Sequence, residues 1–319
     1  MKISVLGCGR WGSFIAWYLN KIGHNVTLWG RESSENFAKI KESHKNDIIT
    51  FDNSIKLTNS LEEAVSSSQI IIISISCQAL NNFCKTLSSL ELSGKVIVLC
   101  MKGIDENSAK RLTEIVRNHI DESSPVAIWV GPGHVEDFSR GIPNCMVIDS
   151  DNKEIKESLV KSFSSDLIRF YIGSDLIGNE IGAAAKNVIG IAAGMLDGIG
   201  YSSLKGALMS RGTREIARLI VAMGGKEISA YGLCHLGDYQ ATLFSEHSHN
   251  RKFGEMFIKG KKYTKLAEGV ATTRALVKLG DKYHVDLPIT NAVDLIINKN
   301  ENPNKVISNL FLRSIKTEF

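Results

Sequence analysis

The sequence predicts an α/β domain built on a parallel sheet, followed by a second domain that contains only helices. Three observations support this fold class. In the first half of the chain, short apolar runs alternate with segments of helical periodicity, as in a parallel sheet covered on both faces. After about residue 173 the chain shows no further convincing strand pattern. The length of 319 residues also suits two domains better than one.

Each expected strand is a short apolar run that ends at a glycine or a polar residue. These runs are KISVLG, NVTLWG, QIIIISIS, KVIVLC, VAIWV, NCMVID and LIRFYIG. The intervening segments with helical periodicity are WGSFIAWYLNKIG, SLEEAVSSS, NNFCKTLSSL and SAKRLTEIVRNHI. The first domain should therefore be a sheet whose strands are joined mainly by helices.

The second half of the chain consists of longer segments with helical periodicity. The expected helices are Glu180–Met195, Leu204–Met223, Phe253–Ile258, Lys265–His284, Asn291–Asn298 and Asn304–Ile315. The change of pattern falls between Gly173 and Gly178. We therefore expect domains at 1–175 and 176–319.

The composition is that of an ordinary globular protein, with 43% hydrophobic and 23% charged residues. The net charge of +4 is spread along the chain, which favours a small anionic partner over nucleic acid. Six scattered cysteines without a CxxC pair indicate reduced core thiols and no metal site. The chain begins directly with a strand, and its apolar runs are too short to span a bilayer. We therefore expect a cytoplasmic protein.

A glycine-rich loop follows the first expected strand. VLGCGRWG places Gly7, Gly9 and Gly12 in the spacing GxGxxG at the start of a helix. Gly7 would allow a tight turn, Gly9 would let a pyrophosphate approach the backbone, and Gly12 would let helix and strand pack closely. The helix N-terminus would favour the negative charge. The loop therefore predicts a dinucleotide-binding, Rossmann-like domain.

The residues after the second strand bear on the choice of dinucleotide. Glu32 lies 20 residues after Gly12, where an acid can accept a hydrogen bond from a ribose 2′-hydroxyl. Arg31 stands beside it and can pair with a 2′-phosphate. We expect NADP(H) as the favoured cofactor, with NAD(H) as the alternative.

One lysine stands in the middle of an apolar helix. IGAAAKNVIGIAAGM runs from Ile181 to Met195, and an unpaired buried ammonium at Lys186 would be costly. Gly190, Gly194 and Gly198 follow on the same helical face, where they allow close approach of another backbone. Structural alternatives are a side chain that extends to the surface or a buried ion pair. We interpret Lys186 as a functional lysine in a packed region, beside the unusual Asn187.

Further candidates lie at the ends of strands and in turns. Lys102 directly follows a buried strand, where it faces the ligand crevice or solvent. Gly131 and Gly133 follow another strand in WVGPGH, a turn whose amides can approach a ligand. In GLCHLGDYQAT, Asp238 precedes Thr242 by four residues, and its structural alternative is a helix N-cap.

A polar cluster precedes a later helix. SEHSHNRKFG brings hydroxyl, amide and cationic side chains together at an expected helix N-terminus. Such groups hold a phosphate monoester, although a hydrophilic loop has the same composition. The members of the cluster are Ser248, His249, Asn250, Arg251 and Lys252.

Together these residues resemble the bacterial-type NAD(P)-dependent glycerol-3-phosphate dehydrogenases. The resemblance runs nearly end to end, and its most specific part is KNVIGIAAG with DGIG, followed by GD, T and NRKFG. The matching stretches are GCGRWG, LWGR, MKGI, GPGHVEDFSRGIP, GAAAKNVIGIAAGMLDGIG, LMSRGTREIARL, GLCHLGDYQAT, HSHNRKFG, AEGVATT and DLPI.

The resemblance implies a Rossmann domain, a helical substrate domain of the 6-phosphogluconate dehydrogenase C-terminal type, and a homodimer. It also implies reversible hydride transfer between NAD(P)H and dihydroxyacetone phosphate, giving sn-glycerol 3-phosphate for glycerophospholipid synthesis. Lys186 would be the general acid/base, with Lys102 and Asp238 as charged neighbours. The implied substrate contacts are Lys102, Gly131, Gly133, Lys186, Asn187, Asp238, Thr242, Ser248, His249 and Asn250. The implied cofactor contacts are Gly7, Gly9, Arg10, Trp11, Gly12, Arg31, Lys102, Val135, His249, Leu266 and Glu268.

The sequence departs from the family pattern at two places. His249 stands where the family usually has an arginine, and histidine offers no bidentate fork. The lost hydrogen bond could weaken phosphate binding unless Arg251 or Lys252 compensates. Ser76-Cys77 replaces the usual Pro-Ser, which should alter only the stiffness of a loop.

Two other functions remain open from the sequence. One is a reductase of the same architecture acting on a small hydroxy or keto acid, which would need contacts to a carboxylate instead of a phosphate. The other is a catalytically weak NAD(P)-binding regulator, marked by the change at His249.

Overall fold

The computed structural model describes residues 1–315 and 317–318, which form two compact units. Unit 1 comprises Met1–Lys102 and Lys110–Glu180. Unit 2 comprises Gly103–Ala109 and the chain from Ile181 onward. Unit 2 therefore includes a short segment that directly follows Lys102.

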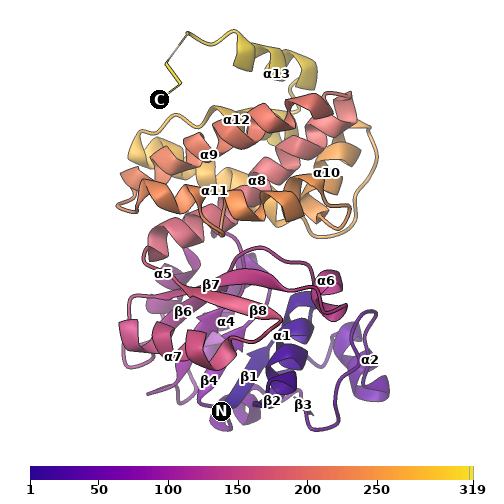
Figure 1. Ribbon diagram of the computed structural model, residues 1–319, viewed down its shortest axis with the longest axis vertical. Coiled ribbons are helices and arrows are strands. Elements are labelled where there is room, and N and C mark those ends of the chain that lie inside the picture. Colours follow the sequence, from indigo (N-terminus) through magenta and orange to yellow (C-terminus); the bar gives the residue numbers. More distant parts are fainter. Residues whose placement is uncertain (316, 319) are drawn as a thin grey trace. The chain divides into compact units, whose positions relative to one another are not determined.

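Unit 1 is an eight-stranded sheet in the order β3-β2-β1-β4-β5-β6-β7-β8 (Figure 1). All neighbouring strands are parallel except β6 and β7, which run antiparallel. The order of the first six strands is that of a Rossmann fold. The strands are β1 Lys2–Leu6, β2 Asn25–Trp29, β3 Lys56–Thr58, β4 Ile70–Ile73, β5 Val96–Leu99, β6 Val126–Val130, β7 Asn144–Ser150 and β8 Ile168–Ile172.

The sheet confirms the predicted strands and adds one. β3 has only three residues, one of them buried, so it shows too little alternation to be recognised. The antiparallel step at β7 was also not predicted, because an apolar run does not specify the direction of its strand. β4 and β6 are buried along their whole length, which means that both faces of the sheet are covered.

The helices of unit 1 include three that were not expected, α2, α6 and α7. α2 has only Phe37 and Ile40 buried, a weak apolar face, and it begins where Ser34 accepts a hydrogen bond from the Phe37 amide. The α-helices are α1 Arg10–Lys21, α2 Glu35–Ser43, α3 Leu61–Ser66, α4 Leu80–Leu87, α5 Leu112–Arg117, α6 Val135–Ser139 and α7 Lys153–Phe163, with the 3₁₀-helix η1 at Cys77–Ala79.

Among the residues that the structure describes, every named element of unit 2 is a helix, as predicted (Figure 1). Its α-helices are α8 Leu176–Ile199, which begins in unit 1, α9 Lys205–Ala222, α10 His249–Ile258, α11 Glu268–Tyr283, α12 Pro288–Lys299 and α13 Pro303–Phe311. Its short helices are η2 Ser202–Leu204, η3 Glu227–Tyr231, η4 Leu236–Asp238 and the π-helix η5 Gln240–Phe244.

The glycine face of α8 packs directly against α10. A Cβ added at Gly194 would lie 1.9 Å from the carbonyl oxygen of Arg251, and one at Gly198 would lie 2.8 Å from the Ile258 Cβ. From the other side, a Cβ at Gly254 would lie 2.1 Å from the Ile191 carbonyl oxygen. The predicted close approach of α8 and α10 is therefore confirmed. A side chain at any of these three glycines would push the two helix backbones apart.

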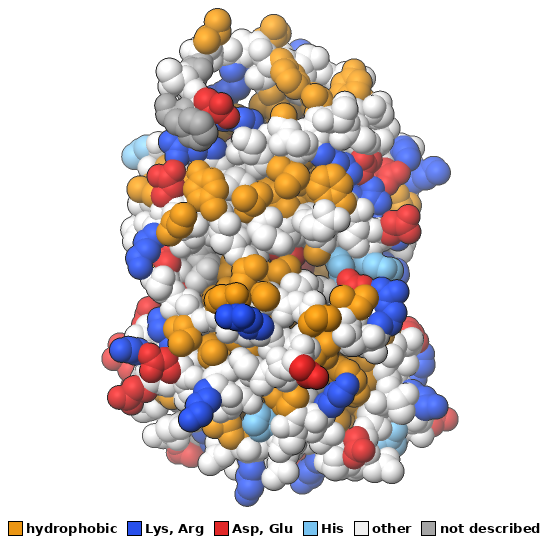
Figure 2. Space-filling view, in the orientation of Figure 1, with side chains coloured by type: hydrophobic (Ala, Val, Ile, Leu, Met, Phe, Trp, Pro, Cys, Tyr) orange, Lys and Arg blue, Asp and Glu red, His pale blue; other side chains and the backbone are white. Residues whose placement is uncertain are grey.

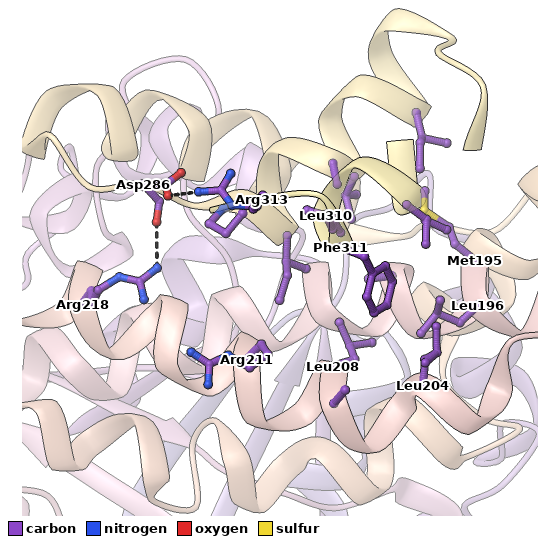
Figure 3. A pocket seen from close by; sticks show the side chains of 18 of the residues that line it. Met195, Leu196, Leu204, Leu208, Arg211, Arg218, Asp286, Leu310, Phe311 and Arg313 are labelled. Atoms are coloured by element: carbon purple, nitrogen blue, oxygen red, sulfur yellow. Dashed lines mark hydrogen bonds and ion pairs between the residues drawn. The ribbon is translucent and has the colours of Figure 1, made fainter. Parts of the chain in front are cut away.

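Unit 2 also has an open cavity of about 380 Å³ between α8, α9, α12 and α13. Apolar side chains such as Leu204 and Leu208 line one end, and Arg218, Asp286 and Arg313 lie at the other (Figure 3). α8 contributes Ala192, Met195 and Leu196, which project from the side of the helix opposite its glycine face. The cavity is therefore separate from the surroundings of Lys186.

The surface and the cysteines agree with the composition. Figure 2 shows cationic and anionic side chains interspersed over the visible face. Each of the six cysteines is a thiol, and all but Cys145 are buried. Within residues 1–315 and 317–318, the structure has no helix that is both long and apolar enough to cross a bilayer.

Candidate active site

The glycine-rich loop lies between β1 and α1, and each glycine has a distinct environment. Gly7 has φ +123°, and an added Cβ would lie 2.1 Å from the carbonyl oxygen of Ser74. A Cβ at Gly12 would lie 2.0 Å from the Gly7 carbonyl oxygen. At Gly9 an added Cβ would meet no described atom within 4 Å. Gly7 and Gly12 are therefore required by packing, whereas Gly9 keeps the backbone accessible.

This loop fits the pyrophosphate of a dinucleotide. Gly9 is the N-cap of α1 and offers no side chain to satisfy the first amides of the helix. Those amides and the helix dipole favour an anion. β1 lies between β2 and β4, so the loop leaves the sheet where the direction of strand addition reverses, the usual place for a nucleotide.

The other predicted cofactor residues near this loop have varied surroundings. Arg10 forms an ion pair with Glu136 of α6. Trp11 packs against Phe14 with ring centroids 5.1 Å apart. Arg31 is exposed and follows the end of β2. Arg31 is therefore accessible to a ligand, whereas Arg10 already has a carboxylate partner.

Lys102 and the second glycine turn lie together at the carboxyl ends of the paired strands β5 and β6. The Lys102 ammonium donates a hydrogen bond to the Gly131 carbonyl oxygen at 2.5 Å. Gly131 and Gly133 have φ values of +129° and +144°, which side chains would disfavour. Val135 is buried at the start of α6. The turn therefore places glycine backbone beside a cation.

Lys186 is the centre of a buried polar group in unit 2. Its ammonium lies 3.0 Å from a carboxylate oxygen of Asp238 and donates a hydrogen bond to the Thr242 hydroxyl at 2.8 Å. The Thr242 hydroxyl in turn donates to the Asp238 carbonyl oxygen at 2.7 Å. Lys186 is 9% exposed and Asp238 1% exposed. Of the two structural alternatives, the structure shows a buried ion pair and not a lysine that extends to the surface.

The local backbone explains how these three side chains meet. Lys186 projects from the middle of α8, whose small residues leave room beside it. Asp238 ends the 3₁₀-helix η4, and Thr242 lies in the π-helix η5. π-Helical turns are rare and concentrate at functional sites. A Cβ at Gly190 would lie 2.7 Å from the Thr242 methyl group, so this glycine lets the turn approach α8.

A second hydrogen-bonded chain extends from the neighbouring residue of α8. The Asn250 amide nitrogen donates to Asn187 at 3.0 Å, and the Asn250 amide oxygen accepts from the Gly269 backbone at 2.9 Å. Asn250 therefore connects α8, α10 and the start of α11. Glu268 begins α11, and Leu266 precedes it with 62% of its surface exposed.

The predicted phosphate cluster is only partly available for a ligand. Ser248 caps α10 and accepts from the Arg251 amide. Arg251, considered above as a compensating cation, already has a carboxylate partner, because its guanidinium contacts Asp197 at 2.6 Å. Burial acts to raise the pKa of Asp197, but hydrogen bonds from Lys205, Ser202 and Arg251 hold that pKa below its usual value. Lys252 is exposed, so it is the remaining cation of the cluster.

His249 has a partner that the sequence did not suggest. Its Nδ1 hydrogen-bonds the hydroxyl of Tyr263, which lies 14 residues later. His235 and Tyr239 were also missed, although they contact each other beside Asp238. Their spacing of four residues was a usable signal, since such residues meet on one helical turn.

Comparison with known proteins adds to this geometry. Residues 2–156 match the family model described as NAD-dependent glycerol-3-phosphate dehydrogenase N-terminus. Residues 175–308 match the model for the C-terminus of the same enzymes. Together the two models cover most of the chain.

Individual relatives match over their full length. A protein from Fusobacterium nucleatum named glycerol-3-phosphate dehydrogenase [NAD(P)+] is 36% identical, and the match covers 100% of this chain and 98% of the relative. A protein of the same name from Thermoanaerobacter is 34% identical over 100% and 99%. The crystal structure of glycerol-3-phosphate dehydrogenase from Coxiella burnetii has a TM-score of 0.92 at 26% identity, covering 98% of this chain and 99% of that one. The chain belongs to the NAD-dependent glycerol-3-phosphate dehydrogenase family.

Proposed function

We propose that this chain catalyses reversible hydride transfer between NAD(P)H and dihydroxyacetone phosphate, giving sn-glycerol 3-phosphate. The observation that carries the proposal is the buried contact of Lys186 with Asp238 and Thr242. A buried ammonium held by a carboxylate and a hydroxyl is a group that can give and take a proton in a fixed position. The family's named activity needs such a group at the reacting oxygen.

In the proposed reaction, Lys186 transfers the proton. A bound nicotinamide supplies the hydride that reduces the ketone carbon. The Lys186 ammonium polarises the carbonyl oxygen and donates its proton to the oxygen as negative charge develops there. Lys186 is then neutral and is reprotonated from solvent before the next turnover. In the oxidation direction the neutral amine accepts the hydroxyl proton.

Asp238 and Thr242 keep Lys186 ready for this step. The Asp238 carboxylate favours the charged ammonium and fixes its position at 3.0 Å. Thr242 accepts a second hydrogen bond from the ammonium while its own proton is committed to the Asp238 carbonyl oxygen. These contacts hold the ammonium in a fixed position, which limits the search for the reactive geometry.

The substrate contacts are proposed from the polar groups near this centre and from the second glycine turn. Lys102 supplies a second positive charge for the substrate. At the start of α10, the exposed Lys252 and the His249 ring are proposed to contact the phosphate. The remaining proposed contacts are Asn187, Ser248, Asn250 and the backbone at Gly131 and Gly133.

For the cofactor, we propose that the chain prefers NADP(H) and accepts NAD(H). Arg31 is exposed directly after β2, where it can pair with a 2′-phosphate. Glu32 beside it can accept from a 2′-hydroxyl. The pyrophosphate would lie at the Gly9 backbone, and Trp11, Val135, Leu266 and Glu268 would complete the contacts.

The cellular role follows from the product. A glycerol phosphate made by reduction would supply the backbone of glycerophospholipids. We propose a cytoplasmic homodimer for this role, on the basis of the family.

An assay of NADPH and NADH oxidation tests the proposal directly. Dihydroxyacetone phosphate should be reduced, with a higher kcat/KM for NADPH than for NADH. Dihydroxyacetone without the phosphate and a small 2-keto acid serve as control substrates. Turnover of the keto acid but not of the phosphate would contradict the proposal, as would cofactor binding without turnover of either.

A further inference from the structure

A buried histidine and tyrosine connect α8 to the turn that carries Asp238. His235 and Tyr239 are both completely buried. The His235 Nδ1 lies 2.9 Å from the Gly182 carbonyl oxygen, and its Nε2 lies 2.7 Å from the Tyr239 hydroxyl. The two rings meet edge to face with centroids 4.9 Å apart. This contact joins two segments that are 53 residues apart in the chain.

The hydrogen bond between His235 and Gly182 lies beside the proposed catalytic contact between Lys186 and Asp238. Gly182 precedes Lys186 by one turn of α8, and His235 precedes Asp238 by three residues in the turn. The Gly182–His235 hydrogen bond and the Lys186–Asp238 ion pair therefore connect the same two segments, one helical turn apart.

The packing around the pair leaves it little freedom. A Cβ at Gly182 would lie 3.0 Å from the His235 Cβ, so the histidine fits against bare backbone on α8. A Cβ at Gly212 of α9 would lie 3.3 Å from the Tyr239 hydroxyl oxygen. Two glycines on two helices thus make room for these two side chains, which pack closely against both helices.

The hydrogen bonds also define the protonation of the histidine. A carbonyl oxygen only accepts, so Nδ1 must carry the proton that it donates to Gly182. Burial lowers the pKa of His235 to about 4, so the ring is neutral near pH 7. Nε2 is then an acceptor, and the Tyr239 hydroxyl donates to it. The Gly182 carbonyl therefore selects the Nδ1–H tautomer of His235, and the Tyr239 hydroxyl supplies the donor that Nε2 of this tautomer needs.

We propose that His235 and Tyr239 are positioning residues that set the Lys186–Asp238 distance. This inference rests on the proposed role of Lys186 and Asp238. Neither His235 nor Tyr239 needs to touch the substrate. Their effect on turnover acts through the placement of Asp238 and Thr242, which lie three residues after His235 and Tyr239 respectively. A small displacement of such groups lowers the rate strongly, because proton transfer depends on the distance between the atoms.

Two conservative variants test the inference by steady-state kinetics with dihydroxyacetone phosphate and NADPH. Tyr239→Phe keeps the ring and removes the hydroxyl that donates to Nε2 of His235. His235→Asn keeps an amide that can donate to Gly182. We expect Tyr239→Phe to lower kcat about tenfold and His235→Asn to lower it by a similar factor. The dissociation constant for NADPH should stay unchanged for both.

Thr290→Val is the matched control for a merely structural effect. Thr290 is also completely buried in unit 2, where its hydroxyl donates to Glu215 at 2.7 Å. This variant should lower the melting temperature as much as Tyr239→Phe does but leave kcat within about twofold. If Thr290→Val and Tyr239→Phe lower kcat equally, the positioning role is wrong.

A double-mutant cycle separates this inference from the proposed function. In an Asp238→Asn background, Tyr239→Phe should have little further effect on kcat, because the placement it serves is already lost. Equal effects in both backgrounds would overturn the positioning role. If Asp238→Asn and Lys186→Ala themselves leave turnover intact, the proposed chemistry is wrong. If they abolish turnover while Tyr239→Phe and His235→Asn do not change it, only the present inference fails.

A spectroscopic measurement tests the tautomer without relying on activity. In protein labelled with ¹⁵N-histidine, the imidazole nitrogen shifts of His235 should show a protonated Nδ1 and an unprotonated Nε2 at pH 7. His235→Asn identifies the resonance by its disappearance. A protonated Nε2 would contradict the assigned hydrogen bonds, and a changed Nε2 shift in Tyr239→Phe would confirm that the hydroxyl donates to this nitrogen.

Discussion

The Lys186 ammonium lies 3.0 Å from the Asp238 carboxylate, with both side chains buried. Breaking such a pair by removing one partner typically destabilises a protein by about 3–5 kcal/mol, because the other charge remains buried. Replacing both by apolar groups of similar volume is often neutral or stabilising. The Lys186–Asp238 pair is therefore not explained by its contribution to the free energy of unfolding. It suits a group that must change its protonation during a reaction.

The glycine loop gives a prediction with an internal control. Gly9→Ala should fold with an unchanged melting temperature, since Gly9 has φ −66° and its Cβ would meet no described atom. The added methyl group should weaken NADPH binding about tenfold or more by blocking the approach of the pyrophosphate. Gly12→Ala should instead destabilise the protein, because its Cβ would lie 2.0 Å from the Gly7 carbonyl oxygen. Equal stability of the two variants would contradict these assignments.

The choice of cofactor should depend on Arg31. Arg31→Ser should raise the KM for NADPH about tenfold or more, since a charge-assisted hydrogen bond contributes about 1.5–3 kcal/mol. The KM for NADH should change by less than about twofold. Lys39→Ser is the control, because Lys39 is an exposed cation of the same unit that pairs with Asp47. A loss of NADPH binding in the control, or an equal loss for both cofactors in Arg31→Ser, would refute the role.

His249 should make phosphate binding depend on pH. If a charged His249 contacts the phosphate, the apparent affinity for dihydroxyacetone phosphate should weaken as pH rises from about 6 to 8. His249→Arg should flatten that dependence, since arginine stays charged. The measurement is KM against pH at saturating NADPH. A flat profile for the unmodified protein would show that His249 is not charged when it binds.

The buried His235 should make stability depend on pH in a defined window. Its pKa is about 4 in the fold, below the ordinary value near 6.5. Between these values the unfolded chain takes up a proton that the folded chain does not, so this contribution to stability is lost as pH falls. Urea denaturation should show the stability difference between the unmodified protein and His235→Asn shrinking below pH 6.5, by at most about 1.4 kcal/mol per pH unit. A constant difference would contradict the neutral, buried ring.

The buried carboxylate of Glu215 also makes stability depend on pH, in the opposite direction. For this reason the stability difference between the unmodified protein and His235→Asn is measured. Burial raises the pKa of Glu215 to about 7, against hydrogen bonds from Thr290 and Ile289 that lower it. A raised pKa gives a contribution that is lost as pH rises through that value. Glu215 is present in both proteins, so its titration cancels in the comparison.

The sequence predicted the parts of the site that depend on local pattern. Gly7, Gly9 and Gly12 are recognisable because a strand, a tight turn and a helix follow each other within a few residues. Lys186 was noticeable because a charge stands alone in an apolar helix whose glycines share one face. In both places, neighbouring residues in the chain define the environment.

The parts that the sequence did not predict depend on contacts between distant segments. Arg251 pairs with Asp197, 54 residues earlier, so its cationic group is engaged although it stands in a polar cluster. The hydrogen bond between Gly182 and His235 joins residues 53 apart in the chain. No sequence pattern within α8 indicates it. β3 was missed for a different reason, since three residues show too little periodicity.

The most direct test of the central claim is the turnover of Lys186→Ala. General acid–base catalysis contributes about 10²–10⁴-fold, so kcat for dihydroxyacetone phosphate reduction should fall at least about a hundredfold. The dissociation constant for NADPH should be unchanged. Lys156→Ala is the control, because Lys156 of unit 1 also pairs with a buried carboxylate, Asp149, and its kcat should stay within about threefold. A Lys186→Ala protein that is folded, binds NADPH and turns over at a near-normal rate would contradict the account.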